Sequence, residues 1–363
     1  MIKYLGSKRR FVTTIGDLYE ASGAETALDL FTGTTRVAQE LCQRGAFTTA
    51  VDTATYSEVL AQCFVETDVA EVDIEEVEAV LARLDALPGV RGYFTQTFCE
   101  ESRYLHPDNG MRVDAIRQAI EDDYADDLLK PIYLTSLLLA ADAVDSTVGL
   151  QMAYLKQWAP RALNRMTLKV PKLIPGTGRA IRGDALTLAP NLPHVGFAYL
   201  DPPYNQHRYF TNYHVWETLI RWDKPDHYGT ACKRIDARDN ETKSPFNSKR
   251  TMPAALAETV AAVNADVLVL SFSNEGFVPL PDLVEMCGAR GDYVAVLGFP
   301  HHRYVGAKIG IHDLKGKKVG KVSHLTNTEY MVVSGEREKV TDMIHSSGLS
   351  DTLVQADSGR LLA

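Results

Sequence analysis

The apolar run TALDLF at 26–31 is the feature that most restricts the fold of this chain. It carries an acid near its end and predicts a buried parallel strand. Over 34–45, apolar residues recur at helical spacing, and Gly45 is placed to end that helix. The next apolar run, FTTAVD at 47–52, predicts a second strand. Strand, helix and strand in this order form the βαβ unit of a doubly wound sheet, so we expect an α/β, Rossmann-like fold.

The pattern changes between 66 and 178. Acidic, helical sequences dominate there, which predicts a helical domain inserted into the α/β domain formed by 1–65 and 179–340. The residues from 341 to 363 are expected to form a C-terminal tail. Helices are predicted at 74–87, 111–124 and 128–144, and further strands at 180–186, 195–201, 266–272, 293–299 and 328–334.

Composition limits the class of protein. The chain has 363 residues, 45% of them apolar, which is enough for one large domain or two ordinary ones. No apolar run is long enough to cross a bilayer, so we expect no membrane partner, and no apolar segment follows MIKYLGSKRR as a secretory signal would require. The five cysteines are scattered without a CxxC pair, which favours reduced thiols in the cytoplasm and predicts no metal site.

Charge is unevenly distributed along the chain. The net charge of −9 argues against a nucleic-acid partner, yet 146–183 contains no acid and many basic residues, and 303–321 is also basic. Local patches decide where a polyanion binds, although runs of charge also occur simply as solvated faces. The two basic stretches therefore favour contacts with phosphates.

The tetrapeptide Asp201-Pro202-Pro203-Tyr204 follows the apolar run FAYL at a predicted strand end. Ligands of open parallel sheets bind beyond such ends. The Asp201 carboxylate and the rigidly held Pro202 carbonyl are suited to accept the N–H groups of an exocyclic amine, and Tyr204 offers a face for stacking on its ring. The alternative is an edge strand ended by prolines. The sequence therefore predicts a binding site for an aminopurine or aminopyrimidine that has been flipped out of a duplex.

Three further residues follow predicted strands. Gly33 would let the backbone approach a ligand, Asp52 stands where an acid binds ribose hydroxyls, and Asp184 ends another strand. Each acid on its own could equally be a helix cap or a surface charge. No G-x-G-x-x-G follows the first strand, which argues against a nicotinamide oxidoreductase.

Together these segments resemble the D12 class N6-adenine DNA methyltransferases of the alpha group, particularly those like the methylase of the FokI system. The resemblance covers most of the chain. The order, with cofactor motifs first and DPPY after them, is that of the alpha group. The matching segments are IKYLGSK (2–8), DLFTGTT (29–35), VDTATYSEVL (51–60), IRGDAL (181–186), DPPY (201–204), LSFSNEGF (270–277) and HHRYVGAKIGIHD (301–313).

The resemblance implies transfer of a methyl group from S-adenosylmethionine to N6 of a flipped adenine in double-stranded DNA. It implies that 66–178 is the target-recognition domain and that 1–65 and 179–340 form the catalytic domain. The residues then expected to contact DNA are Lys156, Arg161, Arg165, Lys169, Arg303, Tyr304 and Lys308. Thr35 departs from the family pattern, since many relatives have a second glycine there, and VDTA lacks the Asn that often precedes the acid. The implied catalytic residues are Asp201, Pro202, Pro203 and Tyr204, and the implied cofactor-binding residues are Tyr4, Lys8, Asp29, Phe31, Gly33, Asp52, Asp184 and Asp201.

Several alternatives remain open at this point. The same tetrapeptide would serve an RNA N6-adenine methyltransferase, and a Rossmann core could also be a noncatalytic nucleic-acid-binding module. His301 and His302 have no nearby acid or third ligand, which favours a surface or DNA-contacting role over a metal. The polar segment 233–250 is expected to be mobile and to become ordered on DNA. The amino-acid sequence does not predict the recognition sequence or the oligomeric state. It also does not predict whether a cognate restriction endonuclease exists.

Overall fold

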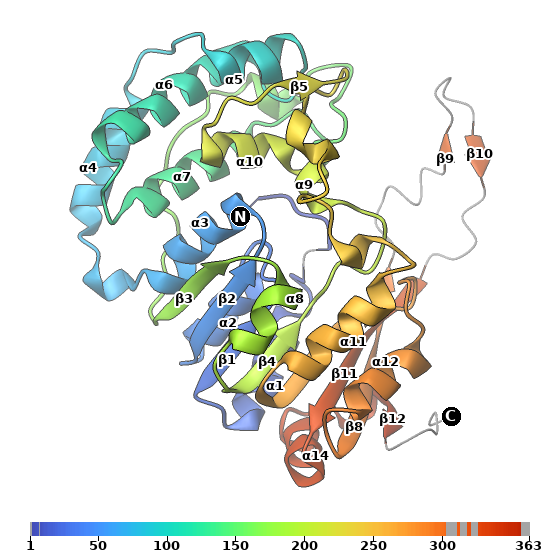
Figure 1. Ribbon diagram of the computed structural model, residues 1–363. Coiled ribbons are helices and arrows are strands. Elements are labelled where there is room, and N and C mark those ends of the chain that lie inside the picture. The colour runs from blue at the N-terminus through green and yellow to red at the C-terminus, as the bar shows by residue number, and fades with distance from the viewer. Residues whose placement is uncertain (1, 7, 303–310, 313–317, 321–325, 357–363) are drawn as a thin grey trace. The chain divides into compact units, whose positions relative to one another are not determined.

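A computed structural model describes residues 2–6, 8–302, 311–312, 318–320 and 326–356 (Figure 1). Its contacts divide the chain into two compact units. No helix in these ranges is both long and apolar enough to cross a membrane. The first unit comprises Met1–Gly16, Glu25–Ala185 and His207–Ser244, and the second comprises Asp17–Ala24, Leu186–Gln206 and Pro245–Ala363.

The first unit contains the predicted strand–helix–strand. Strands β1 (Thr26–Asp29) and β2 (Phe47–Asp52) pair in parallel, and β2 pairs in parallel with β3 (Gly178–Arg182). Helix α2 (Arg36–Gln43) buries the residues that the helical spacing selects. It ends as expected at Gly45, whose φ of 92° allows the Ala46 N–H to bond the Leu41 carbonyl, as in a Schellman motif. The predicted α/β, Rossmann-like class is confirmed.

The helical part of the first unit confirms the three helices predicted between 74 and 144 (Figure 1). One hydrophobic core joins their apolar faces. Short π-helical turns, Gln62–Glu66 and Gln96–Glu100, interrupt the regular pattern. The helices here are α3 (Thr55–Ala61), α4 (Ile74–Asp85), α5 (Tyr93–Thr95), α6 (Pro107–Asp123), α7 (Lys130–Ala143), α9 (Tyr209–Asn212) and α10 (His214–Arg221).

Helix α10 belongs to this helical core although it follows the DPPY segment in sequence. Trp216 and Leu219 of α10 are buried in the same cluster as residues of α4, α6 and α7. The Arg117 guanidinium of α6 donates to the carbonyls of Leu219 and Ile220, both at 3.0 Å, and so satisfies orphan carbonyls near the end of α10. The helical core is therefore not built from 66–178 alone, and the assignment of that range as a recognition domain stays a prediction.

The segment after α10 is folded around a buried arginine. Arg234 is 1% exposed and pairs with Asp223 at 2.6 Å and with Asp236 at 2.7 Å. The two short strands β5 (His227–Tyr228) and β6 (Lys233–Arg234) form an antiparallel hairpin here. The beginning of 233–250 is therefore folded around Arg234, which its polar composition did not indicate. The expectation that this segment is mobile and becomes ordered on DNA stays a prediction.

The second unit carries the remaining predicted strands. Its strand order is β12-β8-β11-β7-β4, with β4 and β7 parallel and β11 antiparallel to both β7 and β8. The range 341–363, expected as a tail, contributes part of α14 and also β12, which pairs with β8. The elements are β4 (Val195–Leu200), α11 (Met252–Ala262), β7 (Ala265–Ser273), α12 (Leu280–Gly288), β8 (Tyr293–His302), β9 (Ile311–His312), β10 (Lys318–Gly320), β11 (Thr326–Gly335), α14 (Arg337–Ser346) and β12 (Leu353–Ala356). Helices α1 (Val12–Ser22) and α8 (Ala185–Leu188) each have residues in both units.

All five cysteines are buried and carry free thiols. They lie at Cys42, Cys63, Cys99, Cys232 and Cys287, and burial raises the pKa of every one of these thiols. This agrees with the expectation of reduced cysteines.

Candidate active site

The first unit brings Gly33 and Asp52 together at the carboxyl ends of β1 and β2. The Gly33 N–H donates to Asp52 Oδ2 at 2.8 Å, and the Ala54 N–H donates to Asp52 Oδ1 at 3.0 Å. Burial raises the pKa of Asp52, and these N–H bonds oppose the rise by favouring its charged form. The acid that the sequence assigns to ribose binding thus also fixes the two loops around it.

Thr35, the departure from the family pattern, adopts a left-handed backbone with φ of 61°. Its N–H bonds the Thr32 carbonyl at 2.7 Å, and its hydroxyl accepts from Gln39 Nε2 at 2.7 Å. Glycine adopts this conformation without strain, whereas a β-branched residue needs such local bonds to hold it. The chain therefore keeps at Thr35 a turn that a glycine would make easily.

Tyr4 lies against this loop. A Cβ on Gly33, whose φ is 51°, would come within 3.0 Å of the Tyr4 ring. The same ring stacks on Tyr213 with centroids 4.6 Å apart and on Tyr209 at 5.3 Å, and Tyr56 meets it edge-on at 6.5 Å. Burial raises the pKa of Tyr4 well above its ordinary value. The strand-end loop is therefore bordered by tyrosine rings.

Sequence reasoning missed three of these rings. Tyr209 and Tyr213 follow the DPPY segment at i and i+4 spacing. Tyr209 begins α9, and Tyr213 lies between α9 and α10. The Leu5 N–H donates to the Tyr213 hydroxyl at 2.6 Å, so this pair also holds the N-terminal motif. The i, i+4 spacing was the available signal, but nothing local in the sequence indicates that these rings meet Tyr4.

The other residues assigned to cofactor binding lie in the same unit, except for Asp201, which belongs to the second unit. Asp29 is buried, and its Oδ2 accepts from the Thr32 hydroxyl at 2.8 Å and from the Ala38 N–H at 3.1 Å. Lys8 is buried where α1 begins, and Phe31 and Asp184 are half-buried at strand ends. Next to Asp184, the Gly183 N–H donates to the Asp52 carbonyl at 2.9 Å. Their roles toward a ligand stay predictions.

The DPPY segment directly follows β4 in the second unit. Asp201, Pro203 and Tyr204 are half-buried, and Pro202 is buried. The Tyr204 carbonyl accepts from the Phe277 N–H at 3.0 Å, and the Tyr204 ring lies 5.8 Å from that of Phe272. Phe272 and Phe277 belong to the LSFSNEGF segment, so that segment positions the tetrapeptide.

The side chain of Asn247 fixes the next residue of this loop. Its Nδ2 donates to the Asn205 carbonyl at 3.0 Å. The chain after β4 is therefore held at both Tyr204 and Asn205 by hydrogen bonds within the second unit. Prolines restrict the backbone on the other side, at 202 and 203, because their rings fix φ.

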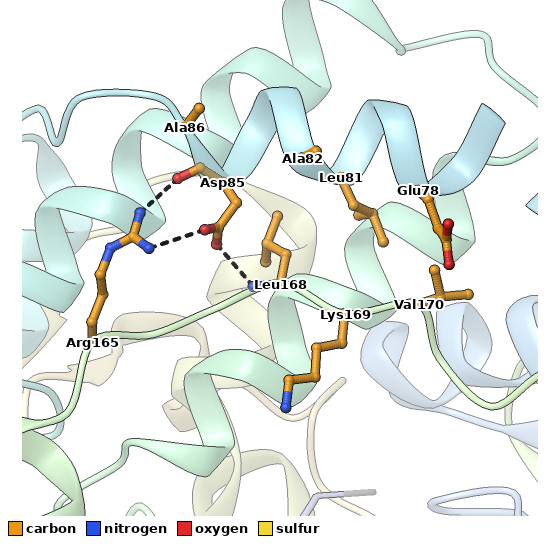
Figure 2. Close-up of a pocket in the computed structure, with 9 residues that line it drawn as sticks. All are labelled: Glu78, Leu81, Ala82, Asp85, Ala86, Arg165, Leu168, Lys169 and Val170. Atoms are coloured by element: carbon orange, nitrogen blue, oxygen red, sulfur yellow. Dashed lines mark hydrogen bonds and ion pairs between the residues drawn. The ribbon is translucent and has the colours of Figure 1, made fainter. Parts of the chain in front are cut away.

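Two of the three arginines expected to contact DNA, Arg161 and Arg165, are engaged within the chain. Arg161 pairs with Asp145 at 2.7 Å, and Arg165 pairs with Asp85 at 3.2 Å. Figure 2 shows Arg165 and Lys169 at a pocket of about 660 Å³ in the helical part, where Asp85 also accepts the Leu168 N–H.

The remaining residues of the DNA-binding prediction divide into two groups. Lys156 and Lys169 are exposed. Arg303, Tyr304 and Lys308 lie outside the described residues. Contact of all these side chains with DNA stays a prediction.

Comparison with known proteins agrees with the motifs. A sequence profile of the D12 class N6 adenine-specific DNA methyltransferases matches residues 4–259. The chain is 28% identical over 305 residues to modification methylase StsI of Streptococcus sanguinis, covering 78% of this chain and 46% of that protein. It is 28% identical over 308 residues to the type II methyltransferase M.NlaIII of Neisseria lactamica, covering 80% and 89% of the two chains.

The type II methyltransferase M.FokI of Planomicrobium okeanokoites is 23% identical over 325 residues, covering 84% of this chain and 50% of that protein. The chain thus spans about half the length of StsI and M.FokI but matches most of M.NlaIII. The profile match extends from the N-terminal motif through DPPY and beyond it. The chain therefore belongs to the family of D12 class N6 adenine-specific DNA methyltransferases.

Proposed function

We propose that this protein transfers a methyl group from S-adenosylmethionine to N6 of adenine at a specific sequence in duplex DNA. Membership of the family supports use of a methyl donor and a DNA substrate. The observation that carries the proposal is the DPPY loop: an acid, two prolines and an aromatic ring directly follow buried β4, and neighbouring segments hold the loop by its backbone.

The first unit fits the proposed cofactor. S-adenosylmethionine carries a sulfonium cation and ribose hydroxyls; aromatic faces attract cations, and a carboxylate accepts from hydroxyls. The tyrosine rings around Tyr4 and the carboxylate of Asp52 supply both kinds of group beside Gly33. In this proposal Tyr4, Phe31, Gly33 and Asp52 line the site. Lys8, Asp29, Asp184 and Asp201 complete the proposed set of cofactor contacts.

The DPPY residues act on the target base. Asp201 and the Pro202 carbonyl accept the two N–H groups of the adenine N6 amine, which shifts that nitrogen toward a tetrahedral shape and frees its lone pair. Pro203 keeps the carbonyl fixed, and Tyr204 stacks on the flipped ring. The bound cofactor supplies an electrophilic methyl group. As N6 becomes methylated it loses one proton, and the Asp201 carboxylate is the nearest acceptor in this arrangement.

DNA itself is proposed to bind the helical part and the basic stretches. Range 66–178 is the proposed target-recognition domain, and the structure favours including α10 in its core. Lys156 and Lys169 would contact phosphates directly, whereas Arg161 and Arg165 would first have to leave Asp145 and Asp85. A DNA substrate and reduced thiols also favour a cytoplasmic location. The names of the relatives lead us to propose a role in DNA modification, with a cognate restriction endonuclease as a partner to be sought.

Sequencing provides the decisive test. The chain is expressed in a host that lacks DNA methylation, and host DNA is read by single-molecule sequencing, with Asp201→Ala as the matched control. We expect N6-methyladenine at one sequence context in the wild-type culture alone. Folded protein that leaves DNA unmodified but methylates transcripts would replace this proposal by an RNA methyltransferase. Folded protein that binds DNA but modifies neither substrate would support a noncatalytic module.

The phosphate contacts are tested through salt dependence. Loss of one phosphate contact lowers the slope of log binding constant against log salt by about one. We expect Lys156→Ala and Lys169→Ala each to reduce the slope in this way, with Lys339→Ala, on α14 and outside both basic stretches, as the lysine control. A slope that neither substitution changes would remove these lysines from the interface.

A further inference from the structure

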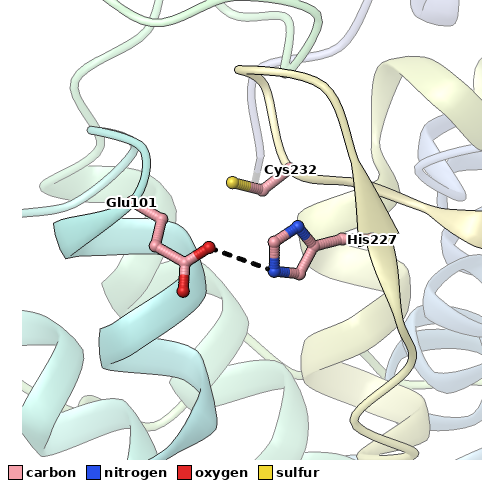
Figure 3. Close-up of side chains that lie close together, drawn as sticks. All are labelled: Glu101, His227 and Cys232. Carbon is pink, nitrogen blue, oxygen red and sulfur yellow. Dashed lines mark ion pairs between the residues drawn. The ribbon is translucent and has the colours of Figure 1, made fainter.

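Three side chains that the proposed methyl transfer does not use meet in the first unit. Glu101 directly follows the π-helical turn Gln96–Glu100, His227 begins β5, and Cys232 precedes β6. One ligand atom from each lies within 4.8 Å of the other two, and Glu101 Oε2 is 3.2 Å from His227 Nε2. Figure 3 shows the three side chains directed toward one another. We propose that Glu101, His227 and Cys232 bind a zinc ion.

The chemistry of the three ligands selects zinc. A thiolate, an imidazole and a carboxylate form the mixed S, N, O set that zinc accepts, whereas magnesium and calcium require oxygen ligands. Four residues separate His227 from Cys232, which is within the spacing of zinc ligand pairs. With zinc bond lengths, tetrahedral N and O ligands stand about 3.4 Å apart. The distance of 3.2 Å between His227 and Glu101 is close to that value.

The three proposed ligands differ in how exposed their side chains are, which bears on how a metal ion could reach them. Cys232 is 2% exposed, His227 is half-buried, and Glu101 is exposed. A metal ion could enter from the Glu101 side, and the thiolate would be shielded from solvent and from oxidation. The metal-free Cys232 side chain is a free, buried thiol. Binding of Zn²⁺ would therefore form the zinc–sulfur bond as the S–H bond releases one proton to water.

The backbone at Cys232 adds a second observation. Its φ is 45°, in the left-handed region that few residues other than glycine adopt. Such conformations cluster where a side chain is held for a function. The turn also contains Gly229 at φ of 69°, and the Tyr104 hydroxyl donates to the Ala231 carbonyl at 2.9 Å. The hairpin tip is therefore held so that Cys232 points toward Glu101 and His227.

The position of the site suggests its effect. A hairpin whose two strands are as short as β5 and β6 has little stability of its own. The Tyr93 hydroxyl donates to the Pro225 carbonyl at 2.6 Å and is one anchor between this segment and α5. A metal bound by Glu101, His227 and Cys232 would add a stronger cross-link at the tip. Three protein ligands also leave a fourth coordination position for water.

An ion pair alone is the competing explanation, and the chain offers a matched control for it. His194 and Asp266 form such a pair at 2.9 Å in the second unit, outside any cluster of metal ligands found among the described residues. An ion pair accounts for the approach of Glu101 to His227, but it does not account for the buried thiol beside them. Removing the thiol therefore separates the two explanations.

The experiment uses the full chain and Co²⁺ as a spectroscopic probe. Protein stripped of metal with a chelator is titrated with Co²⁺, and Zn²⁺ is then added. We expect about one equivalent of Co²⁺ with a thiolate-to-cobalt absorption band in the near ultraviolet, release of one proton, and loss of the band when Zn²⁺ displaces the probe. A wild-type titration without that band would overturn the proposal, whatever the variants do.

The variants assign the ligands. Cys232→Ser should abolish the band, and Glu101→Gln, at an exposed side chain, should weaken Co²⁺ binding by roughly tenfold or more. His194→Gln and Cys287→Ala should leave both band and affinity unchanged. Circular dichroism checks folding, and if Cys232→Ser does not fold, Glu101→Gln and the wild-type spectrum carry the test. A band that survives Cys232→Ser, or an affinity that Glu101→Gln leaves intact, would refute this ligand set.

Discussion

Two acids follow strands of the two units, Asp52 in the first and Asp201 in the second, and they differ in the backbone N–H donors that come after them. Asp52 accepts the N–H of the residue two positions later, Ala54, at 3.0 Å, and also that of Gly33 at 2.8 Å. The residues one and two positions after Asp201 are prolines, which have no N–H. The Asp52 carboxylate therefore accepts backbone hydrogen bonds that fix its own loop. The two prolines after Asp201 cannot donate the corresponding bonds. In the proposed division of roles, Asp52 positions its loop and Asp201 acts on the target amine.

Removing the Asp201 carboxylate should produce the largest effect. We expect Asp201→Ala to lower kcat by at least about 10³-fold, because a preorganised acceptor for the reacting amine is lost. Cofactor affinity, measured by calorimetry, should change far less than kcat, and the thermal unfolding curve should match that of the exposed-site control Asp239→Ala. Methylation at the native rate would end the assignment of Asp201 to catalysis.

Removing the charge of Asp52 should affect binding more than chemistry. We expect Asp52→Asn to weaken S-adenosylmethionine binding by roughly 10- to 100-fold, the value of a hydrogen bond to a charged group, with a smaller effect on kcat at saturation. A larger effect on kcat than on affinity would reverse the proposed division of roles between the two acids.

The same variant tests the effect of burial on the pKa of Asp52. Because this pKa is raised, the folded state holds the proton more tightly than the unfolded chain does. The resulting stability is present below the ordinary pKa of 3.8 and is lost as pH rises through the raised pKa. Relative to wild type, the free energy of unfolding of Asp52→Asn should therefore increase as pH rises from about 4. Denaturant titrations across this range would show a flat difference if burial had no such effect.

Giving the second loop a donor should make it more like the first. Pro203→Ala places an N–H two residues after Asp201, where it can compete for the carboxylate, and it also loosens the backbone. We expect kcat to fall by about tenfold with cofactor affinity nearly unchanged. Pro279→Ala, at an exposed proline of the same unit, is the control, and an equal effect of both substitutions would contradict the argument.

Adding a methyl group to the first loop should produce the smallest change. Gly33→Ala imposes a left-handed alanine, which lowers the stability of the fold by about 1 kcal/mol. It also places a Cβ 3.0 Å from the Tyr4 ring, and displacement of that ring should weaken cofactor affinity by roughly fivefold, about 1 kcal/mol. Gly23→Ala imposes a similar φ, 66°, with nothing within 4 Å of the new Cβ. It should lower the melting temperature without changing affinity, and a loss of affinity there would deny any special role to Tyr4.

The sequence predicted those parts of the molecule that local patterns encode. Apolar periodicity located β1, α2 and β2, and the left-handed Gly45 ended the helix as expected. Contacts between distant segments were not predictable in this way. Charge counting gave Arg165 as free for phosphates, whereas Asp85, far away in the chain, pairs with it.

The tyrosine rings illustrate the same limit within the candidate site. The sequence did not single out Tyr209 and Tyr213, because their packing against Tyr4 joins distant segments of the first unit. Glu101 and Cys232 likewise meet only in the folded chain, which is why the absence of a CxxC pair suggested no metal site. A single sequence records which side chains are present, but partners supplied by tertiary folding leave no local periodicity.

The buried cysteines can report how often the structure around each of them opens. Their neutral, shielded thiols should react with an alkylating reagent only when the surrounding structure opens. Cys63 lies in the first unit and Cys287 in the second. Mass spectrometry of partly labelled protein would therefore measure the rate of local opening in each unit separately, without any inserted probe.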